Sequence, residues 1–449
     1  MRTYAVIGKN FGDEGKGLVS ASLCLHLGKN LIIKHNGGAQ AGHTVECRRG
    51  IDSRCDRESR HDIDSRCDME RGCDVTDDLV RFIHHQIGSG AEFGASTLLA
   101  ETYYSDLYQL GSEIENFNNV YGFIPQIYAE NNTPITVIDD VLLNMAIESK
   151  RGDNRHGSCG MGINECRERI VAGFELTVSD IAENDVDWIF DRLKYIRNEH
   201  TQVRMGELGL DEFAGSGEFG ADRSHGASQE LDGYKSILEM LDDDNVLLNF
   251  SEAVKRNVDY IKVIDADRSW LENFDRIVFE SGQGLLLDEF YLRYAPNLTT
   301  SRTGIINPIT FLKKRGMILN EVIYVTRSYV TRHGAGQLPC ECKREELPGV
   351  EYDITNEPNE WQGSIRYARH VDYEDFLEAM LQDSKYCDDL IDISLAITHL
   401  NETGGKMCFR DFDVSMEAFE KEISKRVSGR QFYRIYKSFD RVASLDLFN

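Results

Sequence analysis

Short apolar runs alternate along the chain with longer stretches in which apolar residues return every three or four positions. Residues 4–7 and 31–33 are continuous apolar runs, typical of buried parallel strands. Residues 18–27 have helical spacing and stop at Gly28, a common type of residue just beyond a helix. The pattern predicts a strand–helix–strand unit. We expect the loops that follow its two strands at the carboxyl ends of adjacent parallel strands, where open α/β sheets bind ligands.

The same reasoning extends along the chain. Residues 175–275 are mainly helical by apolar spacing, with a glycine-rich, irregular stretch at 206–226. Residues 79–87 fit a helix or a strand and lead to a Gly-Ser-Gly turn. Further strands are predicted at 135–138, 277–279, 321–325 and 391–397, and further helices at 141–150, around 376–381 and at 416–427.

The composition of the chain mainly excludes classes of protein. The chain has 449 residues and a formal net charge of −26, which would repel a phosphate polymer, so nucleic-acid binding is disfavoured. Its apolar stretches are shorter than the roughly 18 residues of a membrane span, and the N-terminus opens on a predicted strand without a signal-peptide pattern, so no membrane association is expected. Together with the absence of an export signal, the odd number of cysteines, 11, indicates reduced thiols in the cytoplasm.

Residues 48–78 differ sharply from their surroundings. The run IDSRCD at 51–56 recurs at 63–68, apolar residues are few, and charges of both signs are dense. Such a segment cannot bury enough surface to order itself. The cysteines and His61 raise the alternative of a metal site, but no CxxC pair occurs and the cysteine spacings follow the repeat. We therefore predict a disordered insertion made by local duplication.

The loop after the first predicted strand carries specific chemistry. Residues 12–17 read GDEGKG, in which the glycines let the backbone approach a phosphate and the following helix N-terminus adds amides. Lys16 can place an ammonium on a terminal phosphate. Asp13 and Glu14 would repel phosphate, so they point to Mg²⁺ coordination, general-base work or both. Gly17 stands where an ordinary P-loop NTPase has a hydroxyl residue, which disfavours that class.

The loop after the second predicted strand complements the first. Residues 37–44 read GGAQAGHT, and His43 could donate a proton or stabilise phosphoryl charge. A single glycine-rich loop is often only a turn, but two of them after successive strands favour a shared phosphate site.

The order GDEGKG, strand, GGxxAGHT resembles the adenylosuccinate synthetase family. Four later segments agree in order: HGSCGMGI at 156–163, FESGQG at 279–284, PNLTTS at 296–301 and TRHGAG at 331–336. The resemblance covers most of the chain apart from the segment after Cys47. It implies one large α/β domain over residues 1–449, with residues 48–78 as an insertion. The implied fold is a P-loop-like nucleotide-binding ligase fold with a central, mostly parallel sheet and helical excursions.

The family resemblance also implies a reaction. A ligase of this kind uses a nucleoside triphosphate and Mg²⁺ to phosphorylate O6 of IMP, and the amine of aspartate then displaces the phosphate to give adenylosuccinate. Asp13 would remove the N1 proton, and His43 and Lys16 would stabilise the phosphoryl charge. Gln283 would hydrogen-bond the purine near O6 and N1. By resemblance, Mg²⁺ would sit on Asp13 and the carbonyl of Gly42.

Carried over residue by residue, the resemblance implies three subsites in a cytoplasmic homodimer that makes adenylosuccinate for purine biosynthesis. The residues that bind the donor nucleotide, GTP or ATP, would be Gly12, Asp13, Glu14, Gly15, Lys16, Gly17, Leu18, Gly42, His43, Thr44, His399 and Asn401. The IMP-binding residues would be Gln40, Ala41, Ser158, Gln283, Thr299 and Arg366. The amino-acid-binding residues would be Ser364, Arg366 and Arg369.

The chain departs from the family pattern at several positions. Residues 398–401 read THLN where the family reads guanine with T-K-x-D, and Asn401 would turn amide donors towards the donors of guanine. A serine-glycine-proline turn that supports guanine is replaced by KSFDR at 437–441. Gly173 replaces an arginine that the family lends across its dimer interface, with Arg167 and Arg169 as possible substitutes. Gln40 replaces an asparagine.

Three hypotheses remain open at the level of sequence. The first is an adenylosuccinate synthetase that uses IMP, GTP and aspartate. The second keeps the fold and the Asp13–His43 chemistry but uses ATP, a 2-amino-6-oxopurine nucleotide or another amino acid. The third is a non-catalytic nucleotide-binding protein, against which the retention of Asp13, Lys16 and His43 argues.

Overall fold

A nine-stranded parallel sheet forms the centre of the computed structural model, which describes residues 1–48, 79–152, 160–210, 225–350, 364–388, 390–427, 432 and 434–448. The strand order is β16-β13-β9-β1-β8-β2-β5-β6-β7, and every neighbouring pair runs parallel. The strands are β1 (Arg2–Gly8), β2 (Asn30–Lys34), β5 (Ser96–Leu99), β6 (Ile127–Glu130), β7 (Ile261–Ile264), β8 (Arg276–Gly284), β9 (Glu321–Arg327), β13 (Asp392–Thr398) and β16 (Arg434–Lys437). This confirms the α/β fold with a parallel sheet.

Alternation along the central strands sends side chains to two different layers. On one face Ala5, Ile33 and Phe279 pack with α13 (Ile306–Lys314), α14 (Tyr373–Asp383) and α15 (Met416–Arg426). On the other face Val6 and Ile32 pack with α1 (Lys16–Cys24). Because both faces are covered, these strands read as continuous apolar runs, as the sequence pattern indicated.

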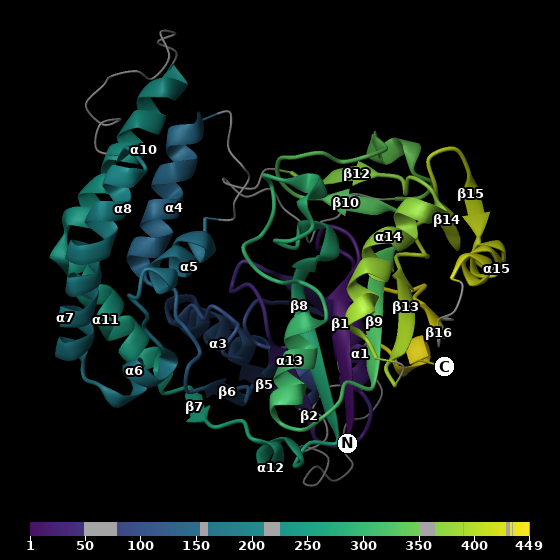
Figure 1. The fold of residues 1–449 in the computed structure, drawn as a ribbon, viewed down its shortest axis with the longest axis horizontal. Helices are drawn as coiled ribbons and strands as arrows, with labels where there is room; N and C mark the ends of the chain where they lie inside the picture. The colour runs from purple at the N-terminus through teal and green to yellow at the C-terminus, as the bar shows by residue number, and fades with distance from the viewer. Residues whose placement is uncertain are drawn as a thin grey trace, which may run out of the picture.

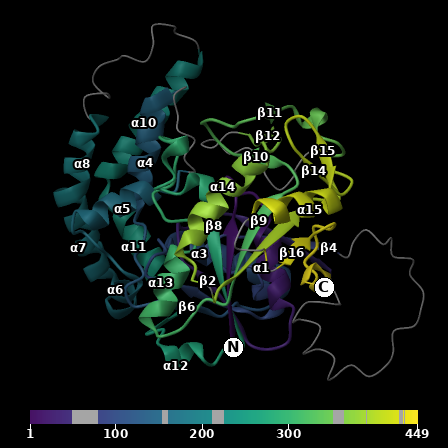
Figure 2. The same cartoon turned by 45° about the vertical axis from the view of Figure 1, so that its right-hand side comes forward.

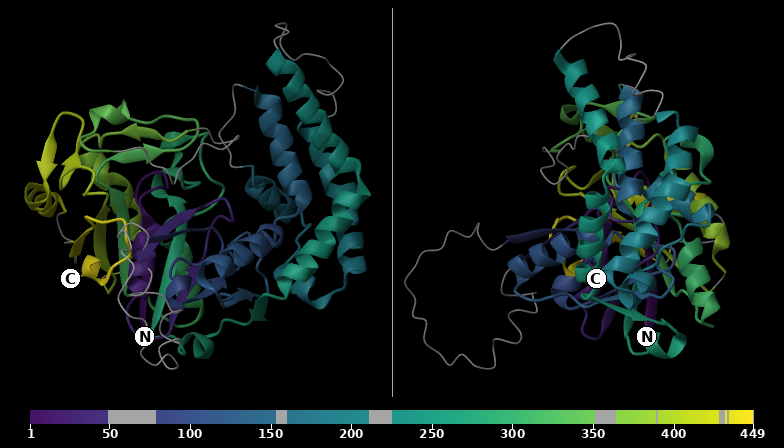
Figure 3. Two further views of the ribbon diagram at one scale, coloured as in Figure 1. Left: turned by 180° about the vertical axis from the view of Figure 1, so that it is seen from behind. Right: turned by 90° about the vertical axis from the view of Figure 1, so that its left-hand side faces the viewer.

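Most of the other helices form a block beside the sheet, at the left of Figure 1. This helical block comprises α4 (Ile138–Arg151), α5 (Ile163–Val171), α6 (Val178–Glu183), α7 (Val186–Ile196), α8 (Gln202–Glu207), α10 (His225–Asp242) and α11 (Asp244–Val258). Seen from behind, it stands clear of the strands on the opposite side of the molecule from the C-terminus (Figure 3). Helix α3 (Leu107–Tyr121) packs with α11 and the strands β5 and β6.

Three small sheets complete the fold. β10 (Val330–Arg332), β11 (Glu341–Cys342) and β12 (Arg366–Ala368) form one antiparallel sheet, and β14 (Lys406–Cys408) pairs with β15 (Asp413–Ser415). Both lie above the main sheet, at the end away from the N-terminus (Figures 1 and 2). The hairpin of β3 (His43–Arg48) and β4 (Leu79–His84) is antiparallel, with His43 opposite His84 and Arg48 opposite Leu79. A short helix, α12 (Arg268–Leu271), precedes β8.

Several predicted elements are confirmed within a few residues. The strands predicted at 4–7, 31–33, 277–279, 321–325 and 391–397 are β1, β2, β8, β9 and β13, and residues 79–87 resolve to the strand β4. The helices predicted at 141–150, around 376–381 and at 416–427 are α4, α14 and α15. Residues 49–78, which carry nearly all of the predicted insertion, lie outside the described residues.

Three predictions about the fold were wrong. Strands β1 and β2 are not adjacent, because β8 lies between them. Helix α1 ends at Cys24 rather than just before Gly28. The side-chain amide of Asn30 donates to the Cys24 carbonyl at 3.0 Å and ends the helical hydrogen-bond pattern there. Residues 135–138 form no strand: Ile135 makes an isolated bridge, and α4 starts at Ile138, with Asp140 accepting the Val137 amide at 2.9 Å.

Candidate functional site

A cavity of about 960 Å³ opens at the carboxyl ends of the central strands. Its walls come from both glycine-rich loops, the end of β4, the helices α3, α4 and α5, the end of β8 and the segments 296–300 and 332–335. Of the predicted site residues, the cavity brings together Gly12, Asp13, Gln40, Ala41, Gly42, His43, Thr44, Gln283 and Thr299. Because β8 lies between β1 and β2, Gln283 stands between the two loops.

Several residues that line this cavity carry buried polar atoms without a hydrogen-bond partner among the described residues. Folded proteins pair nearly all such groups, so a cluster of exceptions points to a ligand. Gln283 illustrates it: its backbone is left-handed, at φ 58°, and its buried Oε1 has no partner among the described residues. The residues of this cluster that line the cavity are Gln40, His43, Glu148, Gln283, Arg332 and His333.

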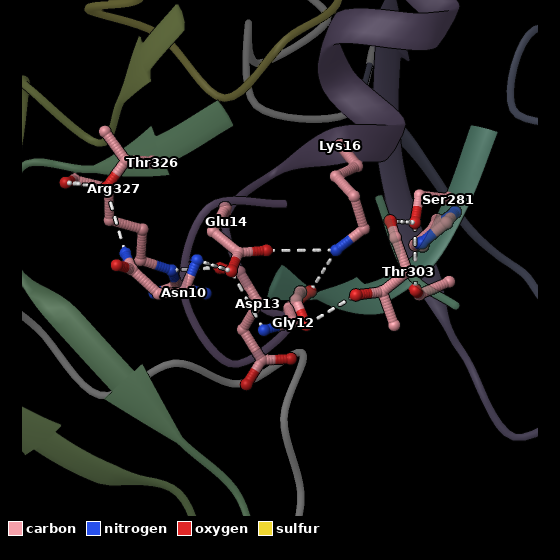
Figure 4. A network of polar contacts seen from close by, with 12 residues as sticks. Asn10, Gly12, Asp13, Glu14, Lys16, Ser281, Thr303, Thr326 and Arg327 are labelled. Atoms are coloured by element: carbon pink, nitrogen blue, oxygen red, sulfur yellow. Dashed lines mark hydrogen bonds and ion pairs between the residues drawn. The ribbon is translucent and has the colours of Figure 1, made fainter. Parts of the chain in front are cut away.

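The first loop is folded around its own Glu14 (Figure 4). The Glu14 carboxylate accepts the amides of Asn10 at 2.8 Å and Gly12 at 2.9 Å. The Lys16 ammonium, fully buried, lies 3.0 Å from Glu14 and donates to the Gly12 carbonyl. Asp13 points away from this pair (Figure 4) and lines the cavity. Glu14 and Lys16 are thus inside the loop, and Asp13 is the acid that reaches the cavity.

The rest of the predicted triphosphate loop lies beneath the cavity. Gly15 is left-handed at φ 86° and caps α1. A Cβ on Gly17 would lie 3.0 Å from the Cβ of His43, so glycine lets α1 pack against the second loop. This close approach explains why no hydroxyl residue stands at position 17. The Leu18 side chain is buried in an apolar cluster with Val45.

His43 is held by a buried chain of charges from two strands. Its Nδ1 lies 3.2 Å from Glu280 in the middle of β8, and the other Glu280 oxygen lies 2.6 Å from Lys34 at the end of β2. Burial lowers the pKa of His43 to about 4, Glu280 opposes this shift and Lys34 adds to it. Burial alone would raise the pKa of Glu280, but Lys34 and His43 hold it well below its usual range. His43 is therefore neutral near pH 7 with an ionised carboxylate behind it.

Asp13 is fixed from two sides. Arg327 donates to its backbone carbonyl, and His333 places Nε2 3.4 Å from the Asp13 carboxylate. Both Asp13 and His333 line the cavity.

The residues predicted to read guanine lie away from the cavity lining. Thr398 donates to the Glu14 carbonyl at 2.7 Å, which joins this segment to the first loop. His399 has a left-handed backbone at φ 59°, and Asn401 is exposed. A neighbour missed from the sequence, Glu402, accepts from the Tyr329 hydroxyl at 2.6 Å.

The predicted amino-acid-binding residues do not line the cavity. Arg366 makes a two-point contact with Glu341 and donates to the carbonyls of Gly334 and Gly336. Arg369 pairs with Asp413 at 2.6 Å, and Ser364 is exposed. Both guanidiniums thus already have carboxylate partners within the fold.

The candidate substitutes for a cross-subunit arginine differ. Arg169 is fully buried, where it pairs with Asp140 at 2.9 Å and donates to the Ile135 carbonyl at 2.7 Å, so it holds α5 to α4 and cannot reach a neighbouring chain. Arg167 is half-buried and pairs with Glu289 at 3.3 Å. Ser158 lies outside the described residues.

Sequence reasoning missed four residues around the site: Lys34, Glu280, Arg332 and His333. Lys34 carried a signal, because a lysine that ends a buried apolar strand needs a counter-charge. Glu280, Arg332 and His333 stood inside matched segments without an assigned role. Only the structure shows that Glu280 faces His43 and that Arg332 and His333 face the cavity.

The donors present fit Mg²⁺. Among the described residues there is no cluster of three or more metal-ligating side chains. Mg²⁺ at nucleotide sites is commonly held by one or two carboxylates together with substrate phosphates and water, so Asp13 and the Gly42 carbonyl are a sufficient protein contribution. No helix in the described part of the chain is long and apolar enough to cross a membrane.

Comparison with known proteins identifies the family of the chain. A sequence model of the family "Adenylosuccinate synthetase" matches residues 69–400, a range that begins after both glycine-rich loops. The adenylosuccinate synthetase of Tolumonas auensis is 24% identical over 415 residues, 90% of this chain and 81% of the relative. That of Prochlorococcus marinus strain NATL1A is 25% identical over 453 residues, 96% of this chain and 86% of the relative.

Two solved structures share the fold. Fully ligated adenylosuccinate synthetase from Plasmodium falciparum has a TM-score of 0.57 at 18% identity, over 89% of this chain and 77% of that chain. Cyanophage S-2L succinoaminodeoxyadenylate synthetase (PurZ), bound to dGMP and dATP as an energy donor, has a TM-score of 0.55 at 13% identity, over 98% of this chain and 93% of that chain. The family model spans most of this chain, and the chain therefore belongs to the adenylosuccinate synthetase family of carbon–nitrogen ligases.

Proposed function

We propose that the chain joins an amino acid to a 6-oxopurine nucleotide in two steps. O6 attacks the terminal phosphate of a nucleoside triphosphate and releases the diphosphate. The amine then attacks C6 and displaces inorganic phosphate. The observation that carries this proposal is that Asp13 and His43, from loops on either side of β8, line one cavity with Gln283 between them.

The side chains have distinct tasks in the first step. Asp13 accepts the N1 proton, which makes O6 nucleophilic, while the Gln283 amide binds near N1 and O6. His43 turns Nδ1 towards Glu280, which leaves Nε2 for the substrate. Glu280 stabilises the imidazolium that forms whenever His43 takes up a proton, as the carboxylate does in a catalytic triad. Bound Mg²⁺, held by Asp13 and the Gly42 carbonyl, would neutralise phosphate charge.

The first loop must rearrange if Lys16 is to touch a phosphate. Its ammonium is buried between Glu14 and the Gly12 carbonyl. A phosphate that reaches the loop amides competes with the Glu14 carboxylate for the same donors. Until then, Lys16 stabilises the shape of the loop.

The leading substrate set is IMP, GTP and aspartate, in a homodimer of the cytoplasm. A second set, a 2-amino-6-oxopurine nucleotide with ATP or a deoxy analogue, is favoured by Asn401, because its amide lacks the paired acceptors that guanine needs. The fold shared with the cyanophage S-2L enzyme, which was solved with dGMP and dATP bound, supports testing this second set as well.

A substrate panel tests the proposal. Purified protein is incubated with IMP, GMP or dGMP, with GTP or ATP, and with single amino acids, and released phosphate and purine absorbance are followed. Asp13→Asn should abolish turnover and leave triphosphate binding measurable by calorimetry, while Glu239→Gln, exposed on α10, serves as the matched control. Equal turnover in Asp13→Asn and wild type would refute the mechanism. If wild type binds nucleotides but turns over none of the substrate combinations, the proposed reaction is refuted.

A further inference from the structure

Arg332, at the end of β10, is a buried cation without a counter-charge. Its residue is 2% exposed, and no carboxylate among the described residues forms an ion pair with it. A buried charge is costly to keep unpaired, so such a group needs a partner that the fold itself does not supply. Burial lowers the pKa of Arg332 to about 10, with a further lowering by Arg366, and it still remains a cation near pH 7.

The protein holds this guanidinium in a built position. It stacks over the Phe11 ring at 4.6 Å and donates to the Gln337 carbonyl at 2.8 Å and the Asn297 carbonyl at 3.2 Å. A Cβ on Gly336 would lie 2.4 Å from Nη2, so only glycine leaves room for it there. The buried Nε has no partner among the described residues, which leaves this donor free for an acceptor.

Arg332 differs in this from the neighbouring arginine. Arg366 donates to the Gly334 and Gly336 carbonyls of the same loop but is neutralised by Glu341 and does not line the cavity. Arg332 does line it, beside His333, whose buried Nδ1 is also without a partner among the described residues. This corner of the cavity therefore holds one cation and two nitrogens without a partner in the described part of the chain.

We propose that Arg332 binds a carboxylate of the amino-acid substrate, a role in the proposed reaction that sequence reasoning gave to Arg366 and Arg369. A guanidinium with an unpartnered donor and no counter-charge suits a carboxylate. His333 links this corner to Asp13, the group at the reacting end of the purine, at 3.4 Å. The α-carboxylate of an amino acid lies two bonds from the attacking amine, so its binding residue must stand near that end. This inference rests on the proposed function.

The test is Arg332→Lys, which keeps the charge and removes the fork. The KM for the amino acid should rise about tenfold to a hundredfold, the usual worth of a charge-assisted hydrogen bond, while the KM values for both nucleotides stay within about twofold. Gly336→Ala, which pushes the guanidinium aside without removing it, should act in the same direction. Arg302→Lys is the matched control, because Arg302 also stacks on a ring, Phe290 at 4.7 Å, but does not line the cavity.

Two results would overturn the inference. One is an unchanged KM for the amino acid in Arg332→Lys; the other is a rise confined to a nucleotide, which would mean that Arg332 holds a phosphate. Calorimetry with succinate and, separately, with inorganic phosphate gives a readout independent of turnover. If wild type turns over no substrate set but binds succinate more tightly than Arg332→Lys does, the proposed function fails and the carboxylate site stands. If succinate binds wild type and Arg332→Lys equally, or binds neither, the carboxylate site is refuted.

Discussion

Replacing Glu280 by glutamine should separate the structural and catalytic tasks of the charges behind His43. The change keeps the shape of the side chain and removes the only carboxylate that pairs with Lys34 in the described part of the chain. The Lys34 ammonium lies 2.6 Å from Glu280, and the Lys34 side chain is 3% exposed. Breaking a buried pair from one side typically costs about 3–5 kcal/mol, because the remaining charge stays buried. For a slope of about 3 kcal/mol per molar urea, the midpoint of unfolding should fall by on the order of 1 M. Glu272→Gln, at the exposed pair with Arg268, should change the free energy of unfolding by less than about 0.5 kcal/mol.

A second substitution makes this reasoning refutable. Adding Lys34→Met removes the orphaned ammonium, so the double variant should regain most of the lost stability. Its kcat should nevertheless stay at least about tenfold below wild type, because His43 still lacks the carboxylate at Nδ1. Circular dichroism in urea and phosphate release measure the two effects. A single variant as stable as wild type would refute the ion-pair argument, and full activity in the double variant would refute the role of Glu280 behind His43.

Two further predictions concern stability. Burial lowers the pKa of His43 to about 4 and of His35 to about 3, so the unfolded chain binds more protons and stability should fall as the pH drops from about 6.5 towards 4. Burial raises the pKa of Asp383 to about 7, so this carboxyl stabilises the folded chain as the pH falls and opposes the effect of the histidines. The test therefore compares wild type with His35→Phe, which should lose less stability on acidification. Parallel curves of urea stability against pH for the two proteins would contradict this prediction. Arg169→Met should cost about 3–5 kcal/mol, because Asp140 is left buried and unpaired. Arg167→Met, at a half-buried pair that water still reaches, should cost under about 1 kcal/mol. Equal urea midpoints for the two variants would contradict the structural role of Arg169.

The sequence predicted the central elements well because their period is simple. Strands such as β1 and β9 are buried on both faces and read as continuous apolar runs, and the glycine-rich loops after β1 and β2 are evident from composition. The short strands β5, β6 and β7 were missed, since four residues each give too little pattern to distinguish a strand from its flanking loops. The order of the strands in the sheet could not be predicted either. The residues around 277–279 carry no local signal that β8 lies between β1 and β2.

The candidate site was predictable where one residue type carries its own chemistry. Asp13 and His43 could be named because an acid in a phosphate loop and a histidine after glycines are unusual. Gln283 was named only through the family resemblance. Which arginines already have a carboxylate partner within the fold could not be predicted. Arg366 and Arg369 looked available in sequence, but their partners Glu341 and Asp413 come from strands 25 and 44 residues away along the chain. Only tertiary contacts distinguish them from Arg332.

The hairpin of β3 and β4 has a consequence for how this protein can change over time. His43 lies at one end of the ladder, and the ladder closes at the other end with Arg48 opposite Leu79. Whatever connects those two residues is anchored by the last rung, and the entropy of closing a loop grows only slowly with its length. The two attachment points, Arg48 and Leu79, are therefore separated from His43 by the whole ladder. A foreign sequence grafted between these two attachment points is expected to leave turnover unchanged.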